Sequence, residues 1–416
     1  MKKILIINGL EKFPEVKYEN CLIHKYVIGL GEEYERDFIS LNNPERINNI
    51  SREIRDRYVD WVSRHNKYFL ENKLIYRSDL SLFFLTDFSN KRIKLFKTYQ
   101  DICNIKILYE IIGQIKFDII EIHGLDKDFI KTFFSDKRSK NLNIKIKDSK
   151  VTKKIGKNLF FQFLKSLNFI LKNFFIFIFH KIIGKIGFES NYIKGDLYLS
   201  RYPLNFSKGQ KFIEDKYKTI PKKDDKFILS ILSDGLIQSC SINKYIQSIF
   251  ELKALNKDFL LIDQNVIMSD IIKSLFNNVK NFWKFKKILS NKFFFDDLDI
   301  TRQINDEIIF SYGRVQNLLM FQKVFERTIK KYSFKKFIFY LHEYSYGRVV
   351  SYTLLRNNIS NSYGMQHGLP SWSWLVYFMS KREINPNKVD KTYLNKIPIP
   401  NYVLAEDPFS KKIYEY

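Results

Sequence analysis

Short apolar runs recur along the chain, and each ends on a polar residue or a glycine. The first spans Ile4–Ile7 and closes on Asn8-Gly9, and another leads from Lys116 to His123-Gly124. Apolar runs bounded by turn residues are typical of strands buried in parallel sheets. The pattern predicts an α/β fold and places His123 at the carboxyl end of a strand, where it is either a turn residue or a substrate-binding group in a crevice.

The same pattern returns after residue 190, with helical stretches between most of the runs. The runs occupy residues 196–200, 227–232, 259–263, 337–341, 363–366 and 402–405. Strands that alternate with helices indicate doubly wound, Rossmann-like sheets. We therefore expect an N-terminal α/β lobe over residues 1–150, a basic amphipathic helical segment over 151–190, and a second Rossmann-like lobe over 191–416.

The segment between the lobes has a different pattern. From Lys131 to Lys185 the acidic residues are confined to Asp136 and Asp148. Residues 159–188 are rich in Phe, Leu and Ile. Polar residues interrupt them mostly at helical spacing: Gln162, Lys165, Asn168, Lys172, Lys181 and Lys185. The lysines argue against a membrane span. They favour a helix lying on an anionic membrane surface, with a buried core helix and a solvated lysine edge as the alternative.

Two neighbouring predicted strands end in polar side chains near the C-terminal end of the chain. His342-Glu343 follows one strand, and Gln366-His367-Gly368 follows the next. The carboxyl ends of parallel strands converge on one crevice, so these residues form the candidate site. For His342 taken alone, a hydrogen-bonded strand-end residue is the plainer interpretation, and substrate binding is the alternative.

These residues carry a family resemblance. The His-Glu strand end, the later Tyr-Gly-Met-Gln-His-Gly loop and the Ile-Pro-Ile-Pro-Asn-Tyr-Val-Leu stretch resemble the bacterial surface carbohydrate biosynthesis family. Its members are similar to GT-B-type glycosyltransferases of capsule and lipopolysaccharide assembly. The matching part covers residues 337–406. The resemblance implies sugar transfer from a nucleotide-sugar donor to a glycan acceptor, expected to be lipid-linked.

The resemblance, together with the inferred strand ends, suggests a role for each candidate. Histidine titrates near neutral pH, so His367 is the expected base or acceptor-orienting group, with Glu343 polarising it. Gln366 and the Gly368 backbone would position the substrate. Arg348, in the following helix, would meet a phosphate as a bidentate donor. Neither a metal nor a cofactor is expected, because no metal-ligand cluster and no glycine-rich dinucleotide fingerprint is present.

The overall charge narrows the choice of partners. The 416 residues carry a formal net charge of +25, with a pI near 9.6. Such a chain suits anionic partners such as lipid headgroups, nucleotides or acidic glycans. Nucleic acid is not expected, because no recognised nucleic-acid motif accompanies the charge.

Two further features indicate where the protein acts. The 3 cysteines are widely spaced, without a Cys-x-x-Cys pair, which is typical of a reducing compartment. The N-terminal apolar run is too short for a signal peptide. We expect a cytoplasmic protein that lies peripherally at the inner face of the cytoplasmic membrane.

The resemblance also leaves an alternative open. Members of the family carry a further Rossmann-like domain after the last matched strand, whereas this sequence ends at Tyr416. Either donor binding is rearranged into the preceding lobes or the chain is an incomplete transferase. The alternative function is a non-catalytic peripheral membrane or scaffold protein of the same pathway.

Overall fold

The computed structural model describes residues 2–9, 21–28, 44–147, 158–188, 190, 192–206, 214–217, 220–231, 241–254, 259–366, 368, 370–372, 374–384 and 392–416. The prediction of an α/β fold with parallel sheets is confirmed, because the described residues form a four-stranded and a six-stranded sheet whose neighbouring strands are all parallel. Residue contacts divide the chain into two compact units, which are described separately.

Unit 1 consists of Met1–Trp61, Lys91–Ile155 and Ser290–Glu307. Its sheet has the order β2 (Cys21–Val27), β1 (Lys2–Asn8), β5 (Ile119–His123) and β6 (Ile144–Lys147). Ile4–Ile7 of β1 have no exposed surface, as expected for a central strand covered on both faces. The other elements are α1 (Pro44–Arg64), which ends in unit 2, α4 (Ile93–Gln114), α5 (Lys127–Ser135), η2 (Lys137–Asn141), β10 (Phe294–Phe295) and β11 (Leu298–Asp299).

Unit 2 consists of Val62–Asn90, Gly156–Leu289 and Ile308–Tyr416. Its sheet has the order β14 (Tyr402–Leu404), β13 (Ser362–Met365), β12 (Phe337–Tyr340), β7 (Leu197–Arg201), β8 (Lys226–Ser230) and β9 (Phe259–Leu261). Followed from β9, this is the 3-2-1-4-5-6 order of doubly wound sheets. The order reverses between β7 and β12, and ligands bind at that point in such sheets.

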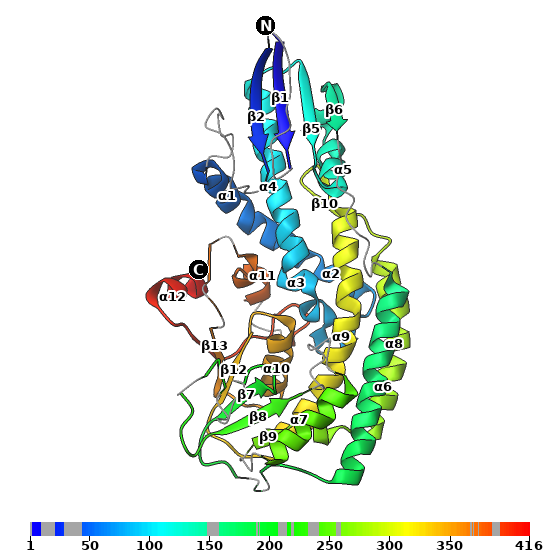
Figure 1. The fold of residues 1–416 in the computed structure, drawn as a ribbon, viewed down its shortest axis with the longest axis vertical. Coiled ribbons are helices and arrows are strands. Elements are labelled where there is room, and N and C mark those ends of the chain that lie inside the picture. The colour runs from blue at the N-terminus through cyan, green and yellow to red at the C-terminus, as the bar shows by residue number, and fades with distance from the viewer. Residues whose placement is uncertain are drawn as a thin grey trace. The chain divides into compact units, whose positions relative to one another are not determined.

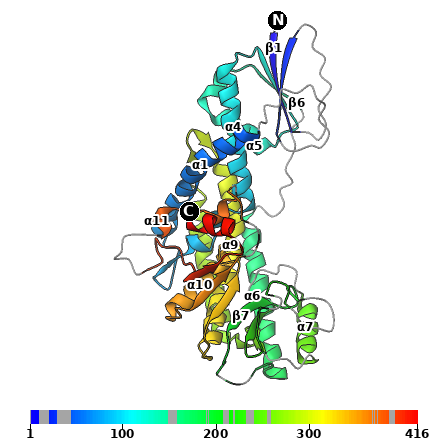
Figure 2. The same ribbon diagram turned by 90° about the vertical axis from the view of Figure 1, so that its left-hand side faces the viewer.

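Helices cover this sheet on both sides, because right-handed crossovers that leave in opposite directions from the reversal point put their helices on opposite faces. Figure 2 shows α10 and α7 on opposite sides of it. The elements of unit 2 outside the sheet are α2 (Asn66–Glu71), β3 (Ile75–Tyr76), β4 (Leu80–Ser81), η1 (Leu82–Leu85), α3 (Asp87–Asn90), α6 (Leu159–Ile183), α7 (Ile242–Ala254), η3 (Asp263–Asn265), α8 (Met268–Ile288), α9 (Thr301–Ile329, which begins in unit 1), α10 (Ser345–Arg356), η4 (Leu375–Tyr377), α11 (Lys381–Ile384) and α12 (Pro408–Glu415).

The two units exchange segments along the chain. Residues 62–90 belong to unit 2 and residues 290–307 to unit 1, exchanges that the predicted boundaries at 150 and 190 did not include. Residues 62–90 are short helices and strands that pack under α10. A hydrophobic period in the sequence does not show which unit a segment joins, because that is decided by its tertiary contacts.

Helices α6 and α8 of unit 2 pack side by side (Figure 1), and each buries several polar residues while it exposes many large apolar ones. In α6 the buried residues include Gln162, Ser166, Asn173 and His180. Its exposed large apolar residues are Phe160, Phe161, Leu164, Leu171, Phe174, Ile178 and Ile182. Of the polar positions expected along one face, Gln162 is buried and Lys172 is half-buried, whereas Lys165, Asn168, Lys181 and Lys185 are exposed.

Helix α8 shows the same mixture. It buries Asp270, Ser274, Asn278 and Asn281 together with Ile271, Phe285 and Ile288, and it exposes Ile272, Leu275, Phe276, Val279 and Trp283. Among the described helices, α6 is long and apolar enough to cross a membrane by length and composition, a criterion that core helices of soluble proteins also meet. Only 28% of its most apolar window is buried, so most of that window faces outward.

Candidate functional site

The candidate site lies where β12 ends and α10 begins. Leu341, directly after β12, has φ 60°, and the chain passes through His342-Glu343 into α10 at Ser345. Gly347 allows this tight connection, because a Cβ atom on it would lie 2.3 Å from the Leu341 carbonyl oxygen and from the His342 Cα. The connection holds His342 and Glu343 at the carboxyl edge of the sheet, beside the point where the strand order reverses.

His342 is packed between the sheet and the C-terminal helix. Its ring lies against Gly364 of β13, where a Cβ atom would be 2.6 Å from the imidazole Cγ. The ring centroid of Tyr414 in α12 lies 5.6 Å away. Neither ring nitrogen has a hydrogen-bond partner among the described residues, and the residue is 2% exposed. We expected His342 to be a hydrogen-bonded strand-end residue, but the described part of the chain supplies no hydrogen-bond partner for it.

Glu343 is the carboxylate closest to that imidazole. Its Oε1 accepts a hydrogen bond of 2.8 Å from the Tyr414 hydroxyl and lies 3.8 Å from His342 Nε2. Within the described ranges its Oε2 has no partner, although the residue is only 1% exposed. Burial, and then the Glu343 charge, raise the pKa of the Tyr414 hydroxyl, which keeps that hydroxyl protonated and able to donate.

Arg348 lies one turn into α10 and is fully buried. Its Nη1 donates to the Phe84 carbonyl oxygen at 3.2 Å and to Ser89 Oγ at 2.6 Å. Burial lowers the pKa of Arg348 to about 10, while the charges of Glu383, Glu343 and Asp87 act in the opposite direction. The guanidinium thus belongs to an internal charge cluster, and a phosphate can reach it only if the covering residues move.

Gln366 links the exits of two neighbouring strands. Its Nε2 donates to the Gly368 carbonyl oxygen at 3.0 Å, and its Oε1 accepts from the Glu406 amide at 2.8 Å. The side chain therefore joins the end of β13 to the end of β14. His367, the expected base, lies outside the described residues.

The exit of β7, on the other side of the reversal point, adds residues that the sequence analysis did not select. Ser200 Oγ donates to Glu214 Oε1 at 2.6 Å, and burial raises the pKa of Glu214. The Arg201 guanidinium lies 4.8 Å from the ring centroid of Tyr346 in α10. The sequence carried a signal for these residues, because the apolar run before Ser200 and Arg201 ends in polar residues as the selected strands do.

His123 is placed in the other unit. It is the last residue of β5, and its Nε2 lies 3.2 Å from Oε2 of the fully buried Glu121. Lys147 Nζ is 3.5 Å from the other oxygen of that carboxylate. His123 therefore belongs to a strand-end group of unit 1, whereas His342, Glu343, Arg348, Gln366 and Gly368 all belong to unit 2.

The strand-end site offers a buried carboxylate next to an imidazole. Such a pair can orient a proton acceptor once substrate has access to it. In the described structure Tyr414 of α12 covers both groups, and the Tyr377 ring lies 5.6 Å from the Tyr414 ring. Access therefore requires α12 to move.

The described part of the chain contains no group of three or more His, Cys, Asp or Glu side chains that could hold a metal ion. The chain was also compared with models of known protein families, with curated proteins and with solved structures, and none of them matches it.

Proposed function

We propose that the protein is a GT-B-like glycosyltransferase of cell-surface polysaccharide or lipopolysaccharide assembly. It would transfer a sugar from a nucleotide-activated donor to a lipid-linked glycan acceptor. The observation that carries this proposal is the pair of polar strand exits, His342-Glu343 and Gln366, beside the reversal point of a doubly wound parallel sheet. The second parallel sheet, in unit 1, is what a fold with two Rossmann-like lobes requires.

In the proposed reaction a base removes the proton from the acceptor hydroxyl. The acceptor oxygen forms a bond to the anomeric carbon as the bond from that carbon to the donor phosphate breaks, and the nucleotide leaves with the bonding electrons. The family resemblance assigns the base to His367, and Glu343 would polarise it. The unpartnered Oε2 of Glu343 supports this role, because a buried carboxylate oxygen without a donor is costly unless a ligand or a moving group supplies one.

The membrane part of the proposal rests on the exposed apolar side chains of α6 and α8. Large apolar side chains face outward on both helices. Lysines lie among them at residues 165, 172 and 181 of α6 and at 273, 280, 284, 286 and 287 of α8. The acidic residue of the two helices, Asp270, is already paired with Arg327. Apolar side chains surrounded by lysines suit the headgroup region of an anionic bilayer.

A second candidate function has its own support. His342 and Glu343 are 2% and 1% exposed, as in a strand-end cluster that only stabilises the fold. A non-catalytic peripheral membrane or scaffold protein would keep this cluster closed and would use only the apolar faces of α6 and α8. Donor binding separates the two candidates.

The deciding experiment is a thermal-stability titration of the purified chain with UDP-, CMP-, GDP- and CDP-activated sugars. A transferase site predicts saturable stabilisation by one nucleotide class, about 2.7 kcal/mol at a concentration 100 times Kd. His367→Ala and Glu343→Gln should abolish sugar transfer, and Glu415→Gln, an exposed carboxylate on α12, should not. A folded chain that responds to no donor contradicts the transferase proposal and supports the scaffold.

Membrane binding has a matched test of its own. Co-sedimentation with vesicles containing phosphatidylglycerol should be lost in Phe276→Glu, whose side chain is 73% exposed on α8. It should be retained in Phe250→Glu, an exposed phenylalanine on α7 outside the two-helix surface. Equal binding by both variants would contradict a membrane role for α6 and α8.

A further inference from the structure

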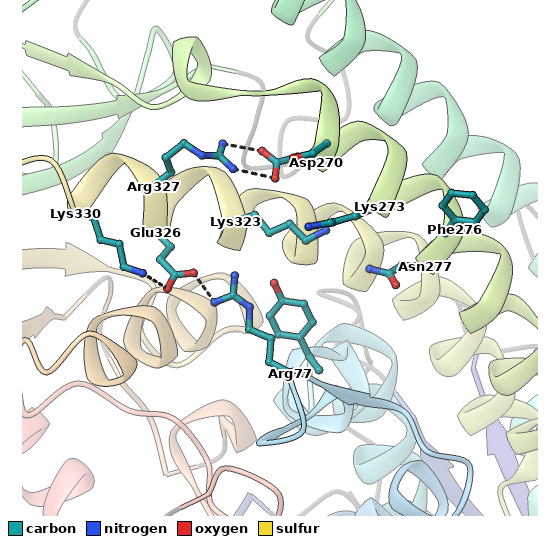
Figure 3. A pocket seen from close by; sticks show the side chains of 11 residues that line it. Arg77, Asp270, Lys273, Phe276, Asn277, Lys323, Glu326, Arg327 and Lys330 are labelled. Carbon is teal, nitrogen blue, oxygen red and sulfur yellow. Dashed lines mark hydrogen bonds and ion pairs between the residues drawn. The ribbon is translucent and has the colours of Figure 1, made fainter.

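A pocket of 580 Å³ lies between α8, the C-terminal part of α9 and the turn after β3 (Figure 3). Its lining residues all belong to unit 2, and none of them belongs to the strand-end site. They are Tyr76, Arg77, Ser269, Asp270, Lys273, Phe276, Asn277, Lys323, Glu326, Arg327 and Lys330. The volume is in the range of small-molecule sites.

The acidic side chains of the pocket already have basic partners. Arg327 holds Asp270 with two hydrogen bonds, of 2.7 and 2.9 Å. Glu326 accepts from Arg77 and lies 3.0 Å from Lys330 Nζ. Five basic side chains therefore face two paired carboxylates, which leaves a formal surplus of three positive charges around the pocket.

Lys323 is a basic residue of the pocket whose Nζ is buried and has no hydrogen-bond partner among the described residues. Figure 3 shows the side chains of Lys323 and Lys273 pointing toward one another. Two ammonium groups that converge from different helices repel each other, and a buried ammonium without an acceptor is costly. An anion bound between them would remove both penalties.

We propose that this pocket binds a phosphate- or diphosphate-bearing ligand. A surplus of three positive charges matches the charge of such a group better than that of a single carboxylate. Arg77 and Arg327 line the pocket but are already bound by Glu326 and Asp270, and Arg327 uses both prongs of its fork on Asp270. Lys323 and Lys273 supply point charges that do not need the same geometry.

The phosphate group can belong to a soluble molecule or to a lipid headgroup. Phe276 lines the pocket and is also part of the exposed apolar face of α8. The pocket therefore opens next to the surface proposed to contact the membrane, where a phosphate headgroup would be available. The pocket site does not depend on the sugar-transfer proposal, because it shares no residue with the strand ends.

The soluble form is tested by titrating the full chain with pyrophosphate and with sulfate in a calorimeter at pH 7. We expect pyrophosphate to bind at least tenfold more tightly than sulfate, and Lys323→Gln and Lys273→Gln each to weaken pyrophosphate binding about tenfold. Lys280→Gln removes an exposed lysine of α8 outside the pocket and should change little. Substitution of Lys323, whose Nζ is buried, could affect folding, whereas Lys273 is exposed, so Lys273→Gln tests the pocket without that complication.

The affinity should also depend on pH in a defined direction. Burial lowers the pKa of Lys323 to about 8, with Lys273 of α8 and Arg77 and Arg327 acting in the same direction and Asp270 opposing them. Glu326 also lines the pocket and is held by Arg77 and Lys330. A bound anion favours the protonated amine, so pyrophosphate should bind more weakly above pH 8, and this decline should disappear in Lys323→Gln.

The lipid form is tested with vesicles of matched surface charge that contain either phosphatidic acid or phosphatidylglycerol. A headgroup site predicts that wild type prefers phosphatidic acid, whose phosphate is terminal, and that Lys323→Gln loses this preference while it still binds phosphatidylglycerol. Pyrophosphate binding without any vesicle preference assigns the site to a soluble ligand. The proposal is overturned if neither preference is observed, or if Lys280→Gln weakens binding as much as Lys323→Gln does.

Discussion

The strand-end cluster and the pocket between α8 and α9 contain similar charged groups, but in opposite states. In the cluster, burial lowers the pKa of Arg348 to about 10, while the nearby charges of Glu383, Glu343 and Asp87 oppose this shift and Nη1 donates two hydrogen bonds. In the pocket, positive charges outnumber negative ones around an open volume. Two hydrogen bonds and the nearby carboxylates offset part of the cost of burying Arg348, whereas Lys323 Nζ makes no hydrogen bond among the described residues, which favours an anionic ligand at the pocket.

This contrast predicts opposite signs for the two regions. Removing the central cation of the cluster should destabilise the protein, and removing the central cation of the pocket should stabilise it. Four substitutions test this, in order of decreasing expected effect.

Arg348→Met should have the largest effect. It removes the hydrogen bonds to Phe84 and Ser89 and takes away a positive charge close to the buried Glu383 and Glu343. Leaving buried carboxylates with an uncompensated charge costs about 3–5 kcal/mol. Urea denaturation measures the loss. Arg356→Met, at the solvent-exposed end of the same helix, should lose about 1 kcal/mol or less. Equal losses in the two variants would show that the cluster contributes no more than a surface ion pair.

Gly347→Ala tests how tightly the strand-end connection is packed. The added methyl would overlap the backbone of Leu341 and His342 at 2.3 Å, and backbone atoms cannot move aside without disturbing the turn. We expect a loss of about 3 kcal/mol in the free energy of unfolding. Gly113→Ala is the matched control, because its Cβ meets nothing within 4 Å in α4. Alanine there should stabilise the helix by up to about 1 kcal/mol. A neutral result for Gly347→Ala would mean that the connection is loose.

Lys323→Met should have the opposite sign. The folded-state pKa of about 8 lies below the ordinary 10.5, so burial penalises the charged amine. Between these two values the unfolded chain binds more protons, and the stability of the native protein rises with pH across that window. At pH 7 the penalty is complete, and its removal should stabilise the protein by about 3 kcal/mol.

The same variant has a pH signature. The difference in unfolding free energy between Lys323→Met and wild type should shrink from pH 8 upward and vanish near pH 10.5, because the wild-type amine is then neutral in both states. Thermal denaturation at several pH values measures it. If Lys323→Met is less stable than wild type at pH 7, the pocket lysine has a structural partner and the contrast fails.

Tyr414→Phe should have the smallest effect and the most local one. It removes the hydrogen bond to Glu343 Oε1 and leaves the ring in place. Tyr414 itself is half-buried, so we expect a loss of about 1 kcal/mol, with faster amide hydrogen exchange at the start of α10. Tyr402→Phe, half-exposed on the edge strand β14, should stay within about 0.5 kcal/mol of wild type. Unchanged exchange at α10 would mean that α12 does not control access to Glu343.

The sequence predicted the class of fold because a buried parallel strand leaves a local record. Phe337–Tyr340 and Ile4–Ile7 are short runs buried on both faces, and a polar residue follows each run within two positions. The same ending located His342, Glu343 and Gln366 at the carboxyl edge of one sheet. The apolar run before Ser200 and Arg201 carried this signal as well, and its polar end was overlooked.

The orientation of α6 was harder to predict. A helical period of polar residues indicates that one face differs from the other, but not which face turns inward. Tertiary packing buries Gln162, Asn173 and His180 and leaves Phe160, Phe161 and Phe174 exposed. A hydrogen bond of 2.7 Å between His180 and Tyr245 in α7 helps to compensate this burial.

The sequence alone determined the parallel α/β class and the positions of strand ends, because both depend on short-range alternation between apolar and polar residues. Only the tertiary structure decided the strand order, the assignment of residues 62–90 to unit 2, and the gathering of Arg77, Lys273 and Lys323 around one pocket. These three basic residues come from segments far apart in the chain. No local sequence pattern predicts that these residues lie together, because the packing of whole helices against one another brings the charges together.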